Sequence, residues 1–122
     1  MTVCLVDDHA DVRRHLSDLL TGAGVDVLSA VGTVSEGEAT VRQLLPDVAV
    51  IDNRLPDGRG IDLCRRLSTL TPEVGLLLHT STVTDEEAIE AIEAGVAAII
   101  LKSIRSEGLL DAIVTFRPDL LP

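Results

Sequence analysis

The stretch 46-PDVAVIDNRLPDGRG-60 decides the fold that this sequence predicts. Its apolar residues 48–51 lead directly into Asp52, and a loop rich in proline and glycine follows at once. A short apolar run that ends in turn residues is typical of a strand buried on both faces of a sheet. The pattern therefore predicts a buried strand that places Asp52 at its C-terminal end, where a carboxylate is available for chemistry.

The beginning of the chain repeats this plan. Residues 2–6 form another apolar run, and Asp7 and Asp8 follow it directly. Parallel neighbouring strands would bring these two carboxylates together with Asp52. Because three like charges at close range repel, the cluster calls for a divalent cation, and carboxylate oxygens of this kind suit Mg²⁺ best.

Strand and helix patterns alternate along the rest of the chain. The expected strands are residues 2–6, 25–31, 48–51, 74–80 and 96–101, and the expected helices are residues 10–22, 34–45, 61–70 and 84–94, with a last helix around 109–113. This alternation predicts an α/β fold, a doubly wound (βα)5 unit with a five-stranded parallel sheet in the order 2-1-3-4-5. Ligands bind such sheets at the carboxyl edge, where the strand ends supply Asp7, Asp8, Asp52, Thr80 and Lys102.

Two of the expected helices begin with the spacing of a capping box, at Thr33–Glu36 and at Thr84–Glu87. Gly37 weakens the first of these helices. For the helix at 84–94 we expect an inner side and an acidic outer side that offers a surface to a protein partner. The inner side would carry Ala88, Ile89 and Ile92, and the outer side Glu86, Glu90 and Glu93.

Composition narrows the range of functions. The 122 residues suit one domain, with a net charge of -10 and Phe116 as the single aromatic residue. Without a basic surface or stacking rings, the chain should not bind DNA unaided. Lys102 is the only lysine, so a site that needs a compact ammonium group must use it.

Other features of the sequence point to a cytoplasmic protein. Cys4 and Cys64 fall at apolar-periodic positions, where we expect reduced thiols in the core. The N-terminus does not resemble a signal peptide, and the longest apolar run is far shorter than the ~20 residues of a membrane span. We therefore expect no membrane partner. His9 and His79 are interpreted as structural residues.

The residues at the carboxyl edge form a set suited to phosphoryl transfer, in which catalysis is mostly positioning and charge neutralisation. Asp52, at the end of the central strand, would be the nucleophile and would form an acyl phosphate. Mg²⁺ would screen the incoming group, while Lys102 and the Thr80 hydroxyl would each hold one of its oxygens.

With these residues in view, the chain resembles a response-regulator receiver domain, CheY-like in fold, over nearly its whole length. The resemblance rests on four pieces: Val6-Asp7-Asp8-His9, Asp52 followed by Leu55-Pro56-Asp57-Gly58, Thr80-Ser81, and Ala94-Gly95 leading to Leu101-Lys102. The pieces Leu-Pro-Asp-Gly-x-Gly-Ile, Asp-Asp-His and Leu-Lys-Ser-Ile are similar to those of the NarL/FixJ class, especially the DosR/DevR-like regulators of actinobacteria.

This resemblance implies that Asp52 accepts a phosphoryl group from a sensor histidine kinase. It implies that Asp7, Asp8, Asp52 and the backbone carbonyl of Arg54 hold Mg²⁺, and that Thr80 and Lys102 bind the phosphate. Phosphorylation would then rearrange the face made by residues 84–94, the strand at 96–101 and the last helix. The domain would be a phosphoacceptor, with at most slow self-catalysed phosphorylation and dephosphorylation, and not an enzyme.

The resemblance also implies an output. Residues 1–122 correspond to the receiver domain, and the helix-turn-helix output domain of the NarL/FixJ class has no counterpart in them. The expected role is therefore control of transcription in a two-component system, with DNA contacted only through a separate output domain. A homodimer is a further partner that the family suggests.

Several positions depart from the family pattern. Ile99 stands where an aromatic residue usually swings inward with the hydroxyl residue, so signal relay through Ile99 and Ser81 would differ from the usual mechanism. Ser103 replaces the usual proline or acid after the lysine. Arg54 and Thr82 flank the phosphate in the family, and we expect them to alter the lifetime of the phosphorylated state.

Three alternatives remain open. A pseudo-receiver that works as a protein-interaction module without phosphate is favoured by Ile99 but not by the complete set of pocket residues. An aspartyl-nucleophile phosphatase of the haloacid-dehalogenase type would need Asp-x-Asp after the first strand, where this chain has adjacent Asp7 and Asp8. A flavodoxin-type binder would need a phosphate loop rich in serine and threonine after the first strand.

Overall fold

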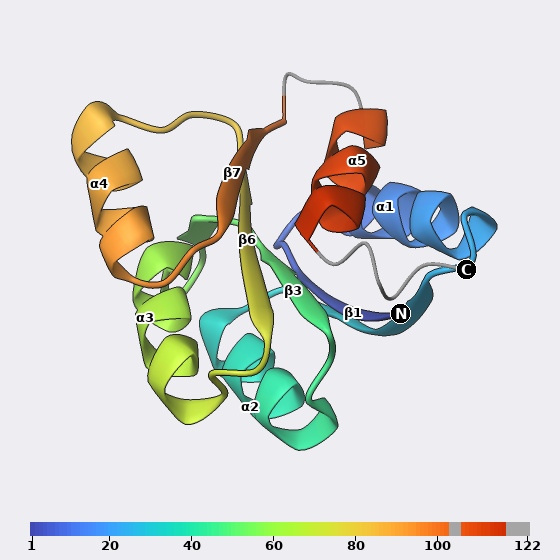
Figure 1. Cartoon of the computed structure of the whole chain (residues 1–122), viewed down its shortest axis with the longest axis horizontal. Coiled ribbons are helices and arrows are strands. Elements are labelled where there is room, and N and C mark those ends of the chain that lie inside the picture. Colours follow the sequence, from blue (N-terminus) through green and yellow to red (C-terminus); the bar gives the residue numbers. More distant parts are fainter. Residues whose placement is uncertain (103–105, 117–122) are drawn as a thin grey trace.

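A parallel sheet forms the centre of the computed structural model, which describes residues 1–102 and 106–116 (Figure 1). The sheet has five strands in the order β2-β1-β3-β6-β7, which confirms the predicted order 2-1-3-4-5. The strands are β1 (Thr2–Val6), β2 (Asp26–Val31), β3 (Val48–Ile51), β6 (Gly75–Thr80) and β7 (Ala98–Leu101). The predicted α/β class is therefore confirmed, with strand boundaries within two residues of those expected.

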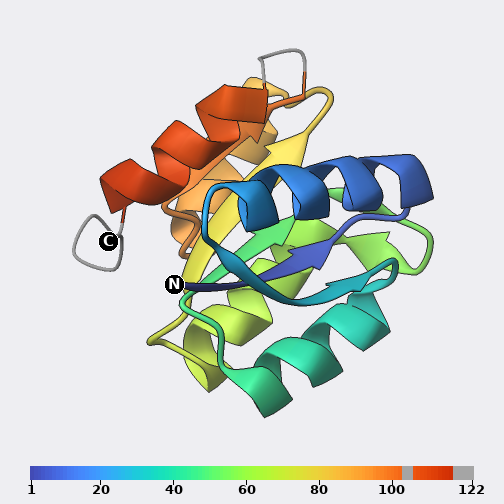
Figure 2. The same cartoon turned by 90° about the vertical axis from the view of Figure 1, so that its right-hand side faces the viewer.

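Five helices cover the two faces of this sheet within the described residues (Figure 2). They are α1 (Ala10–Gly22), α2 (Val34–Leu44), α3 (Gly60–Leu70), α4 (Asp85–Glu93) and α5 (Ser106–Phe116). Helices α1 and α5 lie on one face, and α2, α3 and α4 lie on the other (Figures 1 and 2). Among the described residues, no helix is both long and apolar enough to span a bilayer.

The alternation of side chains along the strands divides the interior into two cores. The core beneath α1 and α5 contains Val3, Leu5, Val48, Val50 and Leu77 of the sheet, with Leu16, Leu20, Leu109 and Ile113 of the helices. The core beneath α2, α3 and α4 contains Cys4, Val6, Ala49, Ile51, Leu76 and Leu78, with Val41, Ile61, Leu63, Leu67, Ala91 and Ala94. Since β1, β3 and β6 are covered on both faces, their sequences are mostly apolar, and the polar residues His79 and Thr80 stand at the C-terminal end of β6.

The two cysteines lie in the second of these cores as free thiols, as predicted. Burial raises the pKa of Cys4 to about 11 and that of Cys64 to about 12, because a thiolate is disfavoured away from water. Both thiols therefore stay protonated at neutral pH and act as small apolar side chains.

A short hairpin after β3 was not predicted as an element. Strands β4 (Arg54–Leu55) and β5 (Gly58–Arg59) pair antiparallel around the turn at Pro56 and Asp57. The Asp57 carboxylate accepts hydrogen bonds from the backbone N–H groups of Val34 at 2.7 Å and Ser35 at 3.1 Å. These bonds lower the pKa of Asp57, and they cap the N-terminus of α2 from a distant part of the chain.

The two expected capping boxes differ in outcome. At α4 the box is complete, because Thr84 and Glu87 bond reciprocally. At α2 the Thr33 hydroxyl accepts from the N–H of Glu36, but the Glu36 carboxylate accepts from the Thr33 hydroxyl at 3.0 Å instead of from its backbone. The predicted box at α2 is therefore only half formed.

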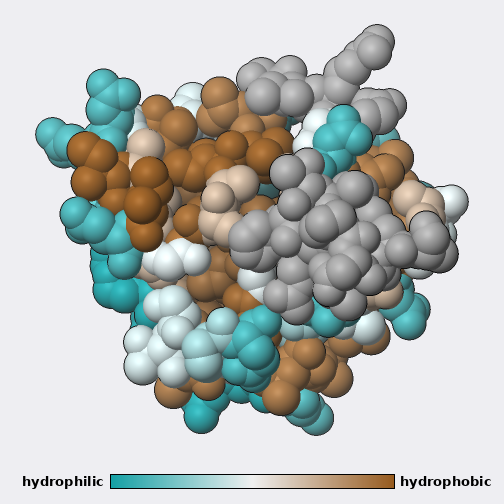
Figure 3. Space-filling model, in the orientation of Figure 1, coloured by the Kyte–Doolittle hydropathy of each residue, from teal (hydrophilic) through white to brown (hydrophobic). Residues whose placement is uncertain are grey.

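The prediction that Ile89 and Ile92 lie on the inner side of α4 is wrong, whereas Ala88 is partly buried. The structure leaves Ile89 and Ile92 with exposed fractions of 58% and 70%, and it buries Ala91 and Ala94 instead. Hydrophobic side chains consequently gather on the surface at the α4 end of the molecule (Figure 3). The physical reason is that Asn53 and Arg59, which bind glutamates of α4, lie beneath the helix.

We expect Gly37→Ala to destabilise the domain even though alanine favours helix. A Cβ at position 37 would lie 2.9 Å from a methyl group of Val6 and 3.1 Å from one of Leu63, both on buried residues. Overpacking of this kind costs about 1–3 kcal/mol, against a gain of about 1 kcal/mol in helix propensity. Urea unfolding followed by circular dichroism should show a lower midpoint. Gly22→Ala, where a Cβ meets nothing within 4 Å, is the control and should raise the midpoint.

Candidate functional site

Three carboxylates meet at the carboxyl edge of the sheet. Val6, Ile51 and Leu78 are in register on β1, β3 and β6, so Asp7 and Asp52 follow neighbouring strands at the same level. Asp7 and Asp52 are buried, whereas the Asp8 side chain is 33% exposed. Ligand atoms of Asp7, Asp8, Asp52 and His9 all lie within 4.8 Å of one another, so this cluster could hold a metal ion.

Lys102 lies opposite the cluster, at the end of β7. Its Nζ is 2.7 Å from Oδ2 of Asp7 and 3.1 Å from Oδ2 of Asp52. Burial lowers the pKa of Lys102, but the hydrogen bonds and charges of Asp7 and Asp52 outweigh this effect and leave the pKa raised. The only lysine of the chain is therefore a fixed positive charge beside the two buried acids.

The predicted hydroxyl residue, Thr80, is fully buried at the end of β6. Its hydroxyl donates to the backbone carbonyl of Thr82 at 3.2 Å, and so it faces the following loop. Arg54 bonds to the same loop, from Nη2 to the Thr82 hydroxyl at 3.1 Å. The backbone N–H of Arg54 approaches Oδ1 of Asp52 at 3.4 Å, which places Arg54 directly beside the acid.

The two expected relay residues lie in different surroundings. Ile99 is partly buried on β7 and packs against the core beneath α2, α3 and α4. Ser81 is exposed in the loop after Thr80. Ser103 lies outside the described residues.

Backbone contacts hold the loops that carry the acids. The Arg13 guanidinium donates to the backbone carbonyl of Asp7 at 2.6 Å. At position 60 a Cβ would collide with the backbone carbonyl oxygen of Asp52, so the close approach of α3 to Asp52 requires glycine. Gly60 also donates its N–H to the carbonyl of Asn53 at 2.9 Å.

Two histidines border the cluster. His79 is buried, and burial together with the charge of Lys102 lowers its pKa, so it is neutral at pH 7. His9 is exposed, with Nδ1 at 3.2 Å from Asp7 and 3.1 Å from Asp8. The sequence did not place His9 among the metal-site residues, although its position directly after the two acids was a signal.

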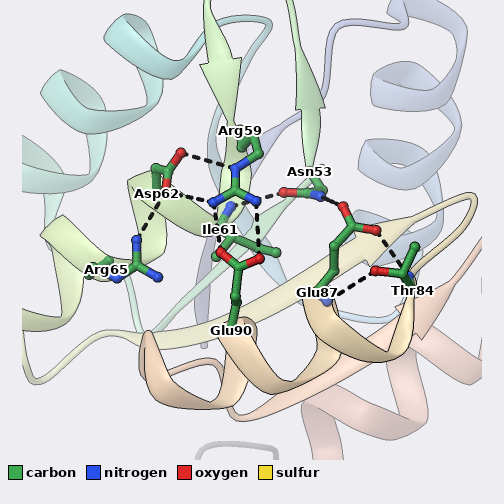
Figure 4. Close-up of polar contacts among 8 residues, drawn as sticks. All are labelled: Asn53, Arg59, Ile61, Asp62, Arg65, Thr84, Glu87 and Glu90. Atoms are coloured by element: carbon green, nitrogen blue, oxygen red, sulfur yellow. Dashed lines mark hydrogen bonds and ion pairs between the residues drawn. The ribbon is translucent and has the colours of Figure 1, made fainter.

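Sequence reasoning also missed Asn53, which is only 2% exposed. Its Oδ1 accepts from the N–H of Ile61 at 3.1 Å, and its Nδ2 donates to Oε2 of Glu87 at 3.0 Å (Figure 4). A polar residue between an apolar strand and a turn looks like an ordinary loop residue, so its adjacency to Asp52 was the only hint in the sequence.

A second polar contact joins the hairpin to α4. Nη2 of Arg59 donates to Oε2 of Glu90 at 2.8 Å, and the same guanidinium bonds Asp62 at 3.1 Å (Figure 4). The hydrogen bonds from Arg59 lower the pKa of both Glu90 and Asp62. Glu87 and Glu90 therefore face the protein, and this explains why Ile89 and Ile92 face solvent.

Fold and site together define a CheY-like α/β protein with an acidic cluster and a lysine at the carboxyl edge of its sheet. The sequence model of the family described as "Response regulator receiver domain" matches residues 3–114. The chain therefore belongs to the response regulator receiver domain family.

Named relatives agree with this assignment. The chain is 47% identical over 113 residues to the DNA-binding transcriptional activator DevR/DosR of Mycobacterium tuberculosis, covering 91% of this chain and 52% of the relative. It is 30% identical over 112 residues to the response regulator protein VraR of Staphylococcus aureus, covering 91% of this chain and 54% of that relative. The chain thus spans about half the length of these relatives.

Solved structures share the fold. A CheY-like receiver domain protein from Methanospirillum hungatei superposes with a TM-score of 0.91 at 25% identity, covering 97% of this chain and 94% of that one. A two-component response regulator of the LuxR family from Aurantimonas gives a TM-score of 0.89 at 28% identity, covering 94% of this chain and 83% of that one.

We expect Lys102→Met to lower the free energy of unfolding at pH 7.5 by about 2–4 kcal/mol, because it leaves two buried carboxylates without a counter-charge. The raised pKa of Lys102 means that its stabilising effect is fully present below its unfolded value of ~10.4 and is lost only as the pH rises through the higher folded value. The deficit should therefore be the same at pH 7.5 and pH 9.5, because Lys102 stays charged at both. Urea unfolding at both pH values measures it, and a deficit that disappears at pH 9.5 would contradict this electrostatic account.

Proposed function

We propose that this receiver domain accepts a phosphoryl group on Asp52 from a sensor histidine kinase. The observation that carries the proposal is the position of the Lys102 ammonium, which contacts both Asp52 and Asp7 at the edge where the acidic cluster lies. A buried carboxylate with an adjacent fixed cation is suited to receive and hold a phosphoryl group.

In the proposed reaction, a carboxylate oxygen of Asp52 attacks the phosphorus of a phosphohistidine. The P–N bond breaks, the imidazole leaves with the bonding electrons, and an acyl phosphate forms on Asp52. Lys102 would transfer its contact to a phosphoryl oxygen. Thr80 would bind another oxygen once its hydroxyl releases the Thr82 carbonyl, while Arg54 and Thr82 flank the site and set the lifetime of the product.

The ion that we propose for the cluster is Mg²⁺, held by Asp7, Asp8, Asp52 and the backbone carbonyl of Arg54. The donor chemistry fits, because three carboxylates of this cluster converge within 4.8 Å and provide the oxygen ligands that this hard cation prefers. When bound, the ion neutralises charge on the phosphoryl group.

We further propose that phosphorylation controls transcription through a separate output domain. One relative is named a DNA-binding transcriptional activator, and this chain spans only about half of it. With a net charge of -10, the receiver itself is unsuited to contact DNA. The partners would be a histidine kinase and, in the active state, a second copy of the chain, with at most slow self-catalysed phosphorylation and dephosphorylation.

A second candidate function is favoured by one observation. Ile99 is partly buried where the family usually has a mobile aromatic residue, so a receiver that acts through protein contacts without phosphate would tolerate this residue. The membership of the receiver family argues against the phosphatase and flavin-binding hypotheses.

Incubation with acetyl phosphate and Mg²⁺, followed by Phos-tag electrophoresis, tests the proposal. The wild type should give a retarded band, because Asp52 becomes an acyl phosphate. Asp52→Asn should abolish the band, and EDTA or Asp8→Asn should reduce it at least tenfold, since the charge on the incoming group is then no longer neutralised. Circular dichroism establishes that each variant is folded.

No retarded band from the folded wild type would instead favour the phosphate-independent receiver. A band that survives Asp52→Asn would show that another residue is the acceptor.

Mg²⁺ should also stabilise the fold without any phosphoryl donor. At a free concentration ten times the dissociation constant, selective binding to the folded state adds about 1.4 kcal/mol, or roughly 5 °C in Tm for a domain of this size. Thermal unfolding at constant ionic strength measures this rise, with NaCl as the matched control. Asp8→Asn should remove most of it, and an unchanged rise in that variant would exclude Asp8 as a ligand.

A further inference from the structure

Asn53, the residue after the proposed phosphoacceptor, links the site to α4 (Figure 4). Both ends of its side-chain amide are hydrogen-bonded. Oδ1 accepts from the N–H of Ile61 at 3.1 Å, and Nδ2 donates to Oε2 of Glu87 at 3.0 Å. A buried amide that is bonded at both ends has a single orientation. A displacement of the chain at Asp52 and Asn53 is therefore transmitted to Glu87.

Glu87 also closes the N-terminus of α4. Its Oε1 accepts from the N–H of Thr84 at 3.0 Å, and its own N–H donates to the Thr84 hydroxyl at 3.1 Å. One carboxylate thus caps the helix with one oxygen and binds Asn53 with the other. A shift of the first turn of α4 away from Asn53 would therefore break one of these bonds.

The loop before α4 is tied to the same site by a second route. The Thr82 carbonyl accepts a hydrogen bond from the Thr80 hydroxyl, and the Thr82 hydroxyl accepts one from the Arg54 guanidinium. Thr82 lies two residues before the helix cap at Thr84. If Thr80 turns to bind a phosphoryl oxygen on Asp52, the Thr82 carbonyl loses its donor. Both routes from Asp52 therefore end at the first turn of α4.

The other half of α4 has a separate anchor, whose side chains contact neither Asp52 nor Asn53. Arg59 binds Glu90 at 2.8 Å, and Asp62 on α3 holds the same guanidinium at 3.1 Å. The N-terminal turn can consequently move while the helix stays attached near Glu90. Such a movement would displace the exposed Ile89 and Ile92.

We propose that the Asn53–Glu87 hydrogen bond is a latch that holds α4 in its resting position and that phosphorylation of Asp52 releases it. This inference rests on the proposed function and names the regulation of the same site. The latch supplies the relay that the usual aromatic residue provides and that Ile99 lacks. By thermodynamic linkage, breaking the latch must favour the phosphorylated form by the same factor by which phosphorylation favours its release.

Glu87→Gln breaks the latch selectively. Glutamine keeps an acceptor oxygen for the N–H of Thr84, but its NH2 group cannot accept from the Asn53 amide. Without phosphate, the backbone amides of residues 85–93 should exchange with deuterium about fivefold faster than in the wild type. The dissociation constant for beryllofluoride, a phosphoryl mimic, measured by calorimetry with Mg²⁺, should fall by about fivefold, which is the low end of typical allosteric coupling.

Two further variants separate the latch from a general effect of charge or stability. Glu86→Gln removes the same charge from the same helical turn at an exposed position, and it should change neither quantity. The double variant Asn53→Asp with Glu87→Gln reverses donor and acceptor. The carboxylate introduced at position 53 can still accept from the N–H of Ile61, and it can also accept from the amide introduced at position 87. The double variant should restore slow exchange in α4.

The outcomes distinguish this inference from the proposed function. A wild type that binds beryllofluoride, together with a Glu87→Gln variant that matches it in both exchange and affinity, would overturn the latch alone. Faster exchange that the double variant does not reverse would also overturn it. A folded wild type that neither binds beryllofluoride nor becomes phosphorylated would overturn the proposed function and the latch with it.

Discussion

The pairing of one ammonium group with two buried carboxylates is the constraint on which the rest of this structure depends. The parallel register of β1 and β3 places Asp7 and Asp52 side by side, and the fold offers them no solvent to relieve their repulsion. Lys102 reaches them from β7, across the intervening β6, and its backbone N–H bonds to the Thr80 carbonyl at 2.8 Å. The edge strand β7 is thus held to the centre of the sheet by the ion pairs of Lys102 as well as by its backbone hydrogen bonds to β6.

The fold and the acidic site could be predicted because both follow from local pattern. Short apolar runs that end in Asp7, Asp52 and Lys102 specify buried parallel strands, and the topology then brings their ends to one edge. Contacts between distant segments could not be predicted in this way. Asp57 caps α2 from 23 residues away, and Asn53 meets Glu87 across 34 residues, so no spacing rule within one element reveals them.

The misassigned face of α4 shows how such distant contacts override periodicity. Burying Ile89 and Ile92 would be worth about 1.5–3 kcal/mol each at full burial. Against this, the structure gains the hydrogen bond from Asn53 to the charged Glu87 carboxylate, at about 1.5–3 kcal/mol, together with the more exposed ion pair between Arg59 and Glu90. It also avoids leaving the buried Asn53 amide without a partner. These quantities are similar in size, so hydrophobic periodicity alone could not decide the orientation of a nine-residue helix.

The same near balance explains why α4 is the helix that a charge change at the site can move. Helices α1 and α3 are held by large side chains such as Leu16, Leu20 and Leu67, whose removal from the core would cost several kcal/mol. Helix α4 contributes only Ala91 to the core from within its own span, and Ala94 follows at its end. Its attachment therefore depends on polar contacts, and a polar contact is what a new charge on a neighbouring residue can break. A helix that is attached weakly by apolar packing, but specifically by hydrogen bonds to the residue beside Asp52, is suited to report the state of that residue.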